Sequence, residues 1–137
     1  MAALPKVLLV DDEERFRNNL QKMLTAEGFQ VTGVESGQKA LEELGLEPYD
    51  VILLDMRMPG MDGLTALAAI KERHPDPEVI ILTGHASVDA AAEIIRLGAV
   101  EFLLKPCPLE EVIAKIETAY DRKLARQEKP QNEDRQD

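Results

Sequence analysis

The stretch VILLDMRMPG, residues 51–60, decides how the rest of the chain is interpreted. Its four consecutive apolar residues, two of them β-branched, are typical of a strand that is buried on both faces of a sheet. The run ends on the carboxylate of Asp55, and Pro59 and Gly60 then turn the chain. Because a buried carboxylate is costly without a compensating partner, Asp55 predicts polar partners at the end of this strand.

Three other apolar runs also end on polar residues. They are residues 7–10, followed by Asp11 and Asp12; residues 79–82, followed by Thr83; and residues 102–104, followed by Lys105 and Pro106. If these strands are parallel neighbours, their carboxyl ends lie at one edge of the sheet. Three acids, a hydroxyl and an ammonium would then converge there.

Helical patterns separate the strand-like runs. Apolar residues recur at helical spacing after Asp12, after a cap at Ser36, after Asp62, before Gly98 and after Pro108. Five strands that alternate with five helices predict an α/β fold with a parallel sheet and helices on both faces. We expect the flavodoxin-like (βα)5 arrangement, doubly wound with strand order 2-1-3-4-5, in which the first and third strands are neighbours.

Composition excludes several classes of protein. A net charge of −10 over 137 residues argues against nucleic-acid binding by this chain, because phosphate contacts need basic patches. No apolar run approaches the length of a membrane span, and the first residues lack the layout of a signal peptide. The single cysteine cannot form an internal disulfide. These features predict a cytoplasmic protein with no membrane contact.

The apolar period ends near Arg122. We therefore expect one domain over residues 4–122 and a charged, disordered tail or linker stub over residues 123–137. Such a tail is compatible with a stand-alone domain, which we favour, and with a fragment that precedes an output domain.

The expected cluster has a definite chemistry. Three carboxylates at one sheet edge repel one another, and a divalent cation relieves that repulsion. Mg²⁺ prefers one or two carboxylates with waters and a phosphate, which is the incomplete shell that Asp11, Asp12 and Asp55 offer. Lys105 and Thr83 add an ammonium and a hydroxyl that suit a doubly charged group of oxygens. Asp55 is then the candidate to accept a phosphoryl group covalently.

This pattern resembles the receiver domain of bacterial two-component response regulators over residues 4–122. The elements that carry the resemblance are Asp11-Asp12, Asp55 followed by Met58-Pro59-Gly60, Thr83, and Lys105-Pro106, in that order. The segment LTGHA, residues 82–86, is similar to receivers attached to enhancer-binding transcription activators.

The resemblance implies a role for each residue of the site. Asp55 would take a phosphoryl group from a phosphohistidine on a sensor histidine kinase or phosphotransfer protein. Mg²⁺ would be held by Asp12, Asp55 and the backbone carbonyl of Arg57, with Asp11 acting through water. Lys105 would pair with the phosphoryl oxygens. Arg57, two residues after the acceptor, is expected to alter the lifetime of the aspartyl phosphate.

The resemblance also implies a switch. Thr83 would move toward the phosphoryl group and Phe102 would fill the vacated space. That movement would change the face made by the helix before Gly98, the strand 100–104 and the helix after Pro108, which a downstream partner would contact. The Lys105–Pro106 peptide is expected to be cis. We expect a monomer or a weak, phosphorylation-dependent dimer.

Alternative functions fit the residues less well. A phosphatase of the haloacid dehalogenase kind also uses an aspartate nucleophile, but it needs a general-acid aspartate where this chain has Arg57. A flavodoxin-type electron carrier needs a hydroxyl-rich phosphate loop after its first strand, whereas this chain has acids there. A degenerate receiver would lack part of the site. We therefore expect a signalling phosphoacceptor that catalyses at most its own phosphorylation and dephosphorylation.

Overall fold

The structure is a computed structural model that describes residues 4–58, 60–84 and 88–136. Pro59, His85 and Asp137, which enter the sequence analysis, lie outside the described residues. No described helix has the length and apolarity that a membrane span requires.

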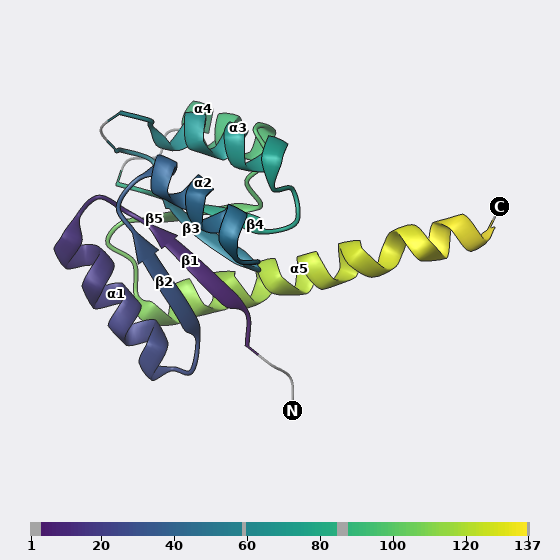
Figure 1. Ribbon diagram of the computed structural model, residues 1–137, viewed down its shortest axis with the longest axis horizontal. Coiled ribbons are helices and arrows are strands. Elements are labelled where there is room, and N and C mark those ends of the chain that lie inside the picture. Colours follow the sequence, from purple (N-terminus) through teal and green to yellow (C-terminus); the bar gives the residue numbers. More distant parts are fainter. Residues whose placement is uncertain (1–3, 59, 85–87, 137) are drawn as a thin grey trace.

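Five parallel strands form one sheet in the order β2-β1-β3-β4-β5, as predicted. The strands are β1 (Lys6–Val10), β2 (Gln30–Val34), β3 (Val51–Asp55), β4 (Glu78–Thr83) and β5 (Glu101–Leu104). The helices are α1 (Glu14–Ala26), α2 (Gly37–Leu46), α3 (Gly63–Arg73), α4 (Val88–Arg96) and α5 (Leu109–Gln136). Strands and helices alternate along the chain, so the α/β fold class is confirmed (Figure 1).

The three central strands, β1, β3 and β4, are buried on both faces because their sequences are continuous apolar runs. Alternate residues of β3 belong to different cores: Ile52 and Leu54 pack with α2, α3 and α4, while Val51 and Leu53 pack with α1 and α5. Figure 1 shows these two groups of helices on opposite sides of the sheet. This double coverage explains why the strand sequences are continuous apolar runs and not alternating patterns.

The register of the strands places the polar residues at one edge. Val10 of β1 pairs with Leu54 of β3, so Asp11 and Asp55 follow at equivalent positions. Asp55 in turn pairs with Leu82 of β4, and Thr83 pairs with Leu104 of β5. Because all strands are parallel, every one of these residues lies at the carboxyl edge of the sheet.

Gly63 fixes the path of the loop between β3 and α3. A Cβ atom at this position would lie 2.5 Å from the Cα of Met56 and 2.6 Å from the carbonyl oxygen of Asp55. The Gly63 amide also donates to the Met56 carbonyl oxygen at 2.9 Å. A residue without a side chain is therefore required here, and the close approach holds the chain that follows Asp55 against the start of α3.

The last helix does not end at Arg122, where the sequence analysis places the end of the domain. It continues to Gln136 and extends away from the sheet (Figure 1). Lys123 is buried and pairs with Asp50 at 2.6 Å, and Arg126 donates to the carbonyl oxygens of Pro75 and Asp76. The first residues of the expected tail thus pack on the domain through polar contacts, which an apolar period does not reveal.

Candidate functional site

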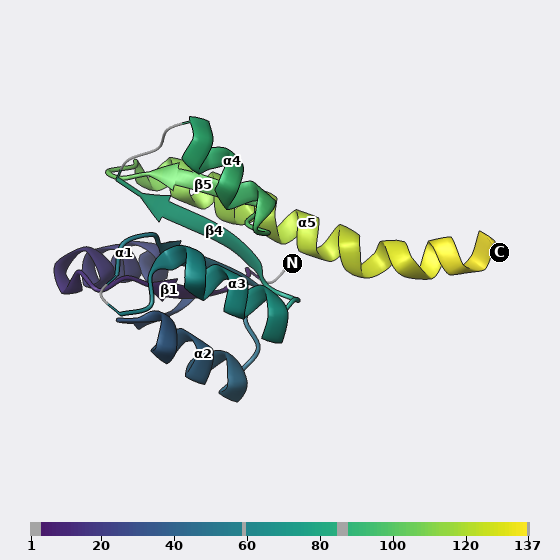
Figure 2. The same cartoon turned by 90° about the horizontal axis from the view of Figure 1, so that it is seen from above.

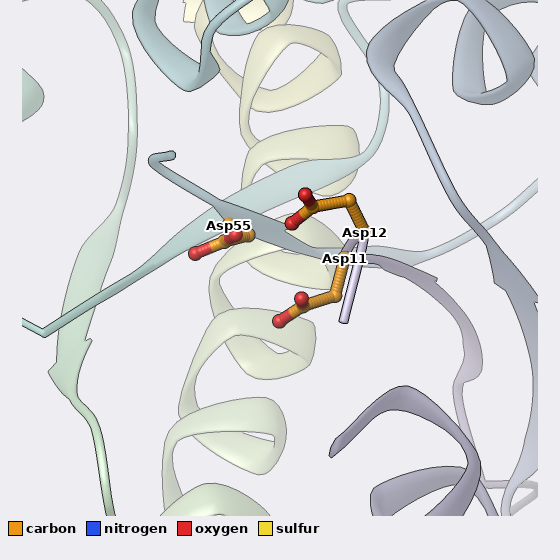
Figure 3. A group of neighbouring side chains, drawn as sticks. All are labelled: Asp11, Asp12 and Asp55. Carbon is orange, nitrogen blue, oxygen red and sulfur yellow. The ribbon is translucent and has the colours of Figure 1, made fainter. Parts of the chain in front are cut away.

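Three aspartates form the centre of the site (Figure 3). Asp11 and Asp12 follow β1, and Asp55 is the last residue of β3. One carboxylate oxygen from each lies within 4.8 Å of the other two. Asp11 and Asp55 are buried, with 0% and 5% of their surface exposed, whereas Asp12 is exposed. The three carboxylates that the sequence analysis expected to converge are therefore side by side.

The backbone and its neighbours fix Asp11 in place. Its carboxylate accepts a hydrogen bond from the Glu13 amide at 2.9 Å, and its carbonyl oxygen accepts one from the Arg17 guanidinium at 2.8 Å. The Asp11 amide donates to the carbonyl oxygen of Val34 on β2. These contacts hold the buried carboxylate toward β3.

Lys105 brings the positive charge. It follows β5, its peptide bond to Pro106 is cis, and its amide donates to the Thr83 carbonyl oxygen at 2.7 Å. The ammonium lies 2.7 Å from Asp11, 3.3 Å from Asp55 and 3.3 Å from Glu13. It also lies over the ring of Phe16, 4.2 Å from the ring centre.

The environment of Asp55 disfavours the charged form of its carboxylate. Burial, followed by the negative charge of Asp11, raises the pKa of Asp55 above its ordinary value, against the opposing effects of Lys105 and the Arg57 amide. For Lys105, burial is the largest influence and lowers its pKa, but the hydrogen bond and charge of Asp11 outweigh it and the pKa is raised. The site therefore keeps its ammonium charged and disfavours the charge on Asp55.

The residues present fit a divalent cation. Their donors are carboxylate oxygens, which hard cations prefer, and a cation would offset the burial and the repulsion by Asp11 that raise the pKa of Asp55. An open pocket of about 340 Å³ lies beside the cluster and leaves room for water and a phosphoryl group. Its lining residues are Asp12, Glu13, Asp55, Arg57, Gly84 and Lys105.

The residues of the expected switch lie on the neighbouring strands. Thr83 is buried at the end of β4, next to the β3 strand that carries Asp55. Phe102 of β5 is half-buried and packs against the core shared by α2, α3 and α4. Arg57 is exposed at the rim of the pocket. Their positions agree with the expected geometry, while their roles remain predictions.

Sequence analysis missed two residues of the site. Glu13 follows the aspartate pair and contributes only a helix-start charge to the pattern, and Phe16 counts only as an apolar residue of the next helix. In the structure both side chains contact Lys105, which is about ninety residues further along the chain. Their position shortly after Asp12 places both residues near the meeting strand ends, but it does not indicate which side chains contact Lys105.

A model of the response regulator receiver domain matches residues 7–117. The chain belongs to this family. The match covers all five strands and the acidic cluster, so the predicted resemblance is confirmed.

Curated relatives of this receiver domain include transcriptional regulators. It is 41% identical over 124 residues to the DNA-binding transcriptional regulator NtrC of Klebsiella pneumoniae. It is 33% identical over 123 residues to DctD of Rhizobium meliloti, a C4-dicarboxylate transport transcriptional regulatory protein. These matches cover 90% of this chain but only 26% and 27% of the two relatives. The chain thus spans about a quarter of the length of these relatives.

Solved structures give the same result for the fold. The receiver domain of the Francisella response regulator 1452 is 30% identical and superposes with a TM-score of 0.81 over 86% of this chain and 98% of that one. NtrX from Brucella abortus is 29% identical, with a TM-score of 0.85 over 91% of this chain and 28% of that one.

Proposed function

We propose that this receiver domain is a phosphorylation-dependent switch, and that Asp55 accepts the phosphoryl group. The observation that carries the proposal is the grouping of Asp55 with two further aspartates and the Lys105 ammonium at one sheet edge. Family membership supports the phosphoacceptor role. The open pocket above Asp55 gives a donor access to its carboxylate.

The transfer is a displacement at phosphorus. A carboxylate oxygen of Asp55 forms the new P–O bond while the P–N bond of a phosphohistidine breaks, and the electron pair of that bond returns to the imidazole nitrogen. The donor is a sensor histidine kinase or a phosphotransfer protein. Lys105, already 3.3 Å from Asp55, pairs with the phosphoryl oxygens and so aligns and neutralises the transferred group.

The metal set follows the carboxylates. Asp12, Asp55 and the backbone carbonyl of Arg57 would hold Mg²⁺, with Asp11 acting through water. The ion, when bound, supplies positive charge to the phosphoryl oxygens. Asp12 suits direct coordination because it is the exposed member of the cluster, whereas Asp11 is buried and engaged by Lys105 and the Glu13 amide.

The switch would act through Thr83 and Phe102. A phosphoryl group on Asp55 gives Thr83 a new acceptor on the adjacent strand, and a shift of Thr83 frees space for Phe102. Figure 2 shows α4, β5 and α5 beside one another at one edge of the sheet. Ile95 of α4 and Leu104 of β5 are exposed there, 47% and 50%, and offer apolar contacts to a downstream protein.

The proposal also covers the extent of the receiver unit, its location, its oligomeric state and its partners. Residues 4–122 form the receiver unit, the protein is cytoplasmic, and it is a monomer or a weak phosphorylation-dependent dimer. It contacts no nucleic acid or membrane, and it catalyses at most its own phosphorylation and dephosphorylation. The net charge of −10 supports the lack of nucleic-acid contact by this chain.

Acetyl phosphate with Mg²⁺ tests the proposal. Mass spectrometry of the parent should show a labile adduct of one phosphoryl group, which Asp55→Asn lacks and which Asp62→Asn, an exposed helix-cap variant nearby, retains. Labelling of Asp55→Asn to the same extent as the parent would refute Asp55 as the acceptor.

A further inference from the structure

The ammonium of Lys105 has one neutral partner among its contacts. Three of these contacts are carboxylates, from Asp11, Glu13 and Asp55, and the fourth is the ring of Phe16, whose centre lies 4.2 Å away. A cation within about 6 Å of an aromatic ring centre is attracted by the ring's electron-rich face. The ring therefore contributes to holding Lys105 and is not merely a neighbour.

The Phe16 ring is fixed by its packing against the hydrophobic core. Phe16 lies in the first turn of α1, is half-buried, and packs against the core that α1 and α5 share. The Glu13 side chain, by contrast, is 66% exposed and is free to turn into water. Of the contacts that Lys105 makes outside the aspartate cluster, the ring is thus the fixed one.

The carboxylate contacts of Lys105 would change during phosphorylation under the proposed function. Asp55 would become an acyl phosphate, and Asp11 and Asp55 would also face a bound Mg²⁺. The negative charge that each carboxylate presents to Lys105 would therefore change during a phosphorylation cycle. The Phe16 ring carries no net charge. It therefore lacks the full negative charge with which a carboxylate repels an incoming phosphoryl group, and it binds neither a proton nor Mg²⁺.

We propose that Phe16 is a positioning residue, which keeps the Lys105 ammonium over the pocket while its carboxylate partners are exchanged for phosphoryl oxygens. This inference rests on the proposed function of Asp55. It assigns Phe16 a role beyond packing, which predicts that an aliphatic side chain of similar size at this position keeps the fold but not the placement of Lys105.

Three variants separate the positioning of Lys105 from packing against the core. Phe16→Leu keeps an apolar side chain against the core and removes the aromatic face, while Phe16→Tyr keeps both. Phe29→Leu is the matched control, because Phe29 is a buried ring of the same core that precedes β2 and does not belong to the site. Thermal unfolding of all three establishes how much each loss of packing costs.

The first measurement follows the side-chain protons of Lys105 by NMR in the unphosphorylated protein. A ring beneath the ammonium shifts the protons next to it upfield, so the parent, Phe16→Tyr and Phe29→Leu should share displaced signals and Phe16→Leu should lose the displacement. Equal Lys105 signals in the parent and Phe16→Leu would overturn the contact. A merely structural role of Phe16 does not produce this pattern.

The second measurement is a titration with beryllofluoride, a phosphoryl mimic, in the presence of Mg²⁺. Phe16→Leu should bind it about three- to tenfold more weakly than the parent, the range expected for loss of one cation–π contact, with Phe16→Tyr and Phe29→Leu close to the parent. Parent-like binding by Phe16→Leu, together with no binding by Asp55→Asn, overturns the role of Phe16 alone. A parent that does not bind beryllofluoride overturns the proposed function itself.

Discussion

Asp55 illustrates how one residue's environment prepares it for reaction. Its carboxylate is almost fully buried beside Asp11, which raises its pKa, and the Lys105 ammonium compensates only in part. Additional positive charge, or loss of the carboxylate charge by conversion to an acyl phosphate, would relieve this cost. The unfavourable negative charge at Asp55 thus favours both the binding of a cation and the formation of an acyl phosphate.

Replacement of Asp55 by asparagine should therefore stabilise the metal-free protein. Since the folded-state pKa of Asp55 is raised, the parent is penalised once pH rises through that pKa, whereas below the ordinary value of 3.8 the neutral acid and the amide are equivalent. We expect Asp55→Asn to raise the free energy of unfolding at neutral pH. Urea unfolding at several pH values should show the gain shrinking as pH falls. Saturating Mg²⁺ should narrow or reverse the difference, because it binds the folded parent. A constant gain across pH would contradict this account.

Glu13 pairs with Lys105 at 3.3 Å through an exposed carboxylate, which would compete with an incoming phosphoryl group for the ammonium. Glu13→Gln should therefore bind beryllofluoride about two- to fivefold more tightly than the parent, the range set by exposed ion pairs. Glu14→Gln is the control, since it removes the same charge from the adjacent exposed position. An equal gain in both variants would assign the effect to net charge and not to the pair with Lys105.

Arg57 lies at the rim of the pocket with an exposed side chain. A long cation there can hinder or orient the water that hydrolyses the aspartyl phosphate, so Arg57→Ala should change the decay rate several-fold. The rate of phosphate release after removal of acetyl phosphate measures this, with Arg57→Lys as the variant that keeps the charge. Equal decay rates of the aspartyl phosphate in the parent and in Arg57→Ala would contradict this role of Arg57.

At the scale of elements, α5 shows a limit of sequence patterns. The core-facing part of the helix, with Val112 and Ile116, has an apolar period and could be predicted. Its continuation beyond Arg122 is anchored by Lys123 and Arg126, whose partners are a carboxylate and three backbone carbonyl oxygens on distant loops. Charged residues give no periodic signal, so the sequence indicates a tail where the structure has a helix whose first residues, Lys123 and Arg126, contact the domain.

Lys123 should matter for stability in spite of its place in a charged segment. Its ammonium is 2.6 Å from Asp50, whose second oxygen accepts the Lys6 amide at 2.8 Å, so Lys123→Ala leaves a partly buried carboxylate with one fewer partner. We expect a loss of about 1.5–3 kcal/mol in the free energy of unfolding, the range for hydrogen bonds to charged groups. Arg122→Ala, on the exposed side of the same helix, is the control. Equal unfolding midpoints for both variants would contradict the anchoring role.

The site shows what strand ends can and cannot predict. Asp11, Asp12, Asp55 and Lys105 could be brought together from sequence because each follows an apolar run, and parallel strands end at one edge. Glu13 and Phe16 could not, because they begin a helix whose rotation about its axis is set by packing. The helix period assigns Phe16 to a core face, but only the structure shows that this face borders Lys105.

At the scale of the whole molecule, the two ends of the parallel strands carry different groups of residues. The carboxyl edge carries the acidic cluster and the pocket, while the opposite edge carries the Asp50–Lys123 pair near the point where α5 leaves the domain (Figure 1). NtrC of Klebsiella pneumoniae is about three and a half times as long as this chain, because the match covers 90% of this chain and 26% of that relative.

A crystal structure with Mg²⁺ and beryllofluoride tests the central claim most directly. The account predicts beryllium on the Asp55 carboxylate, Mg²⁺ at about 2.0–2.1 Å from oxygens of Asp12, Asp55 and the Arg57 carbonyl, and the Lys105 ammonium against a fluoride. Beryllofluoride or Mg²⁺ bound elsewhere, or a Lys105 side chain directed away from Asp55, would contradict it.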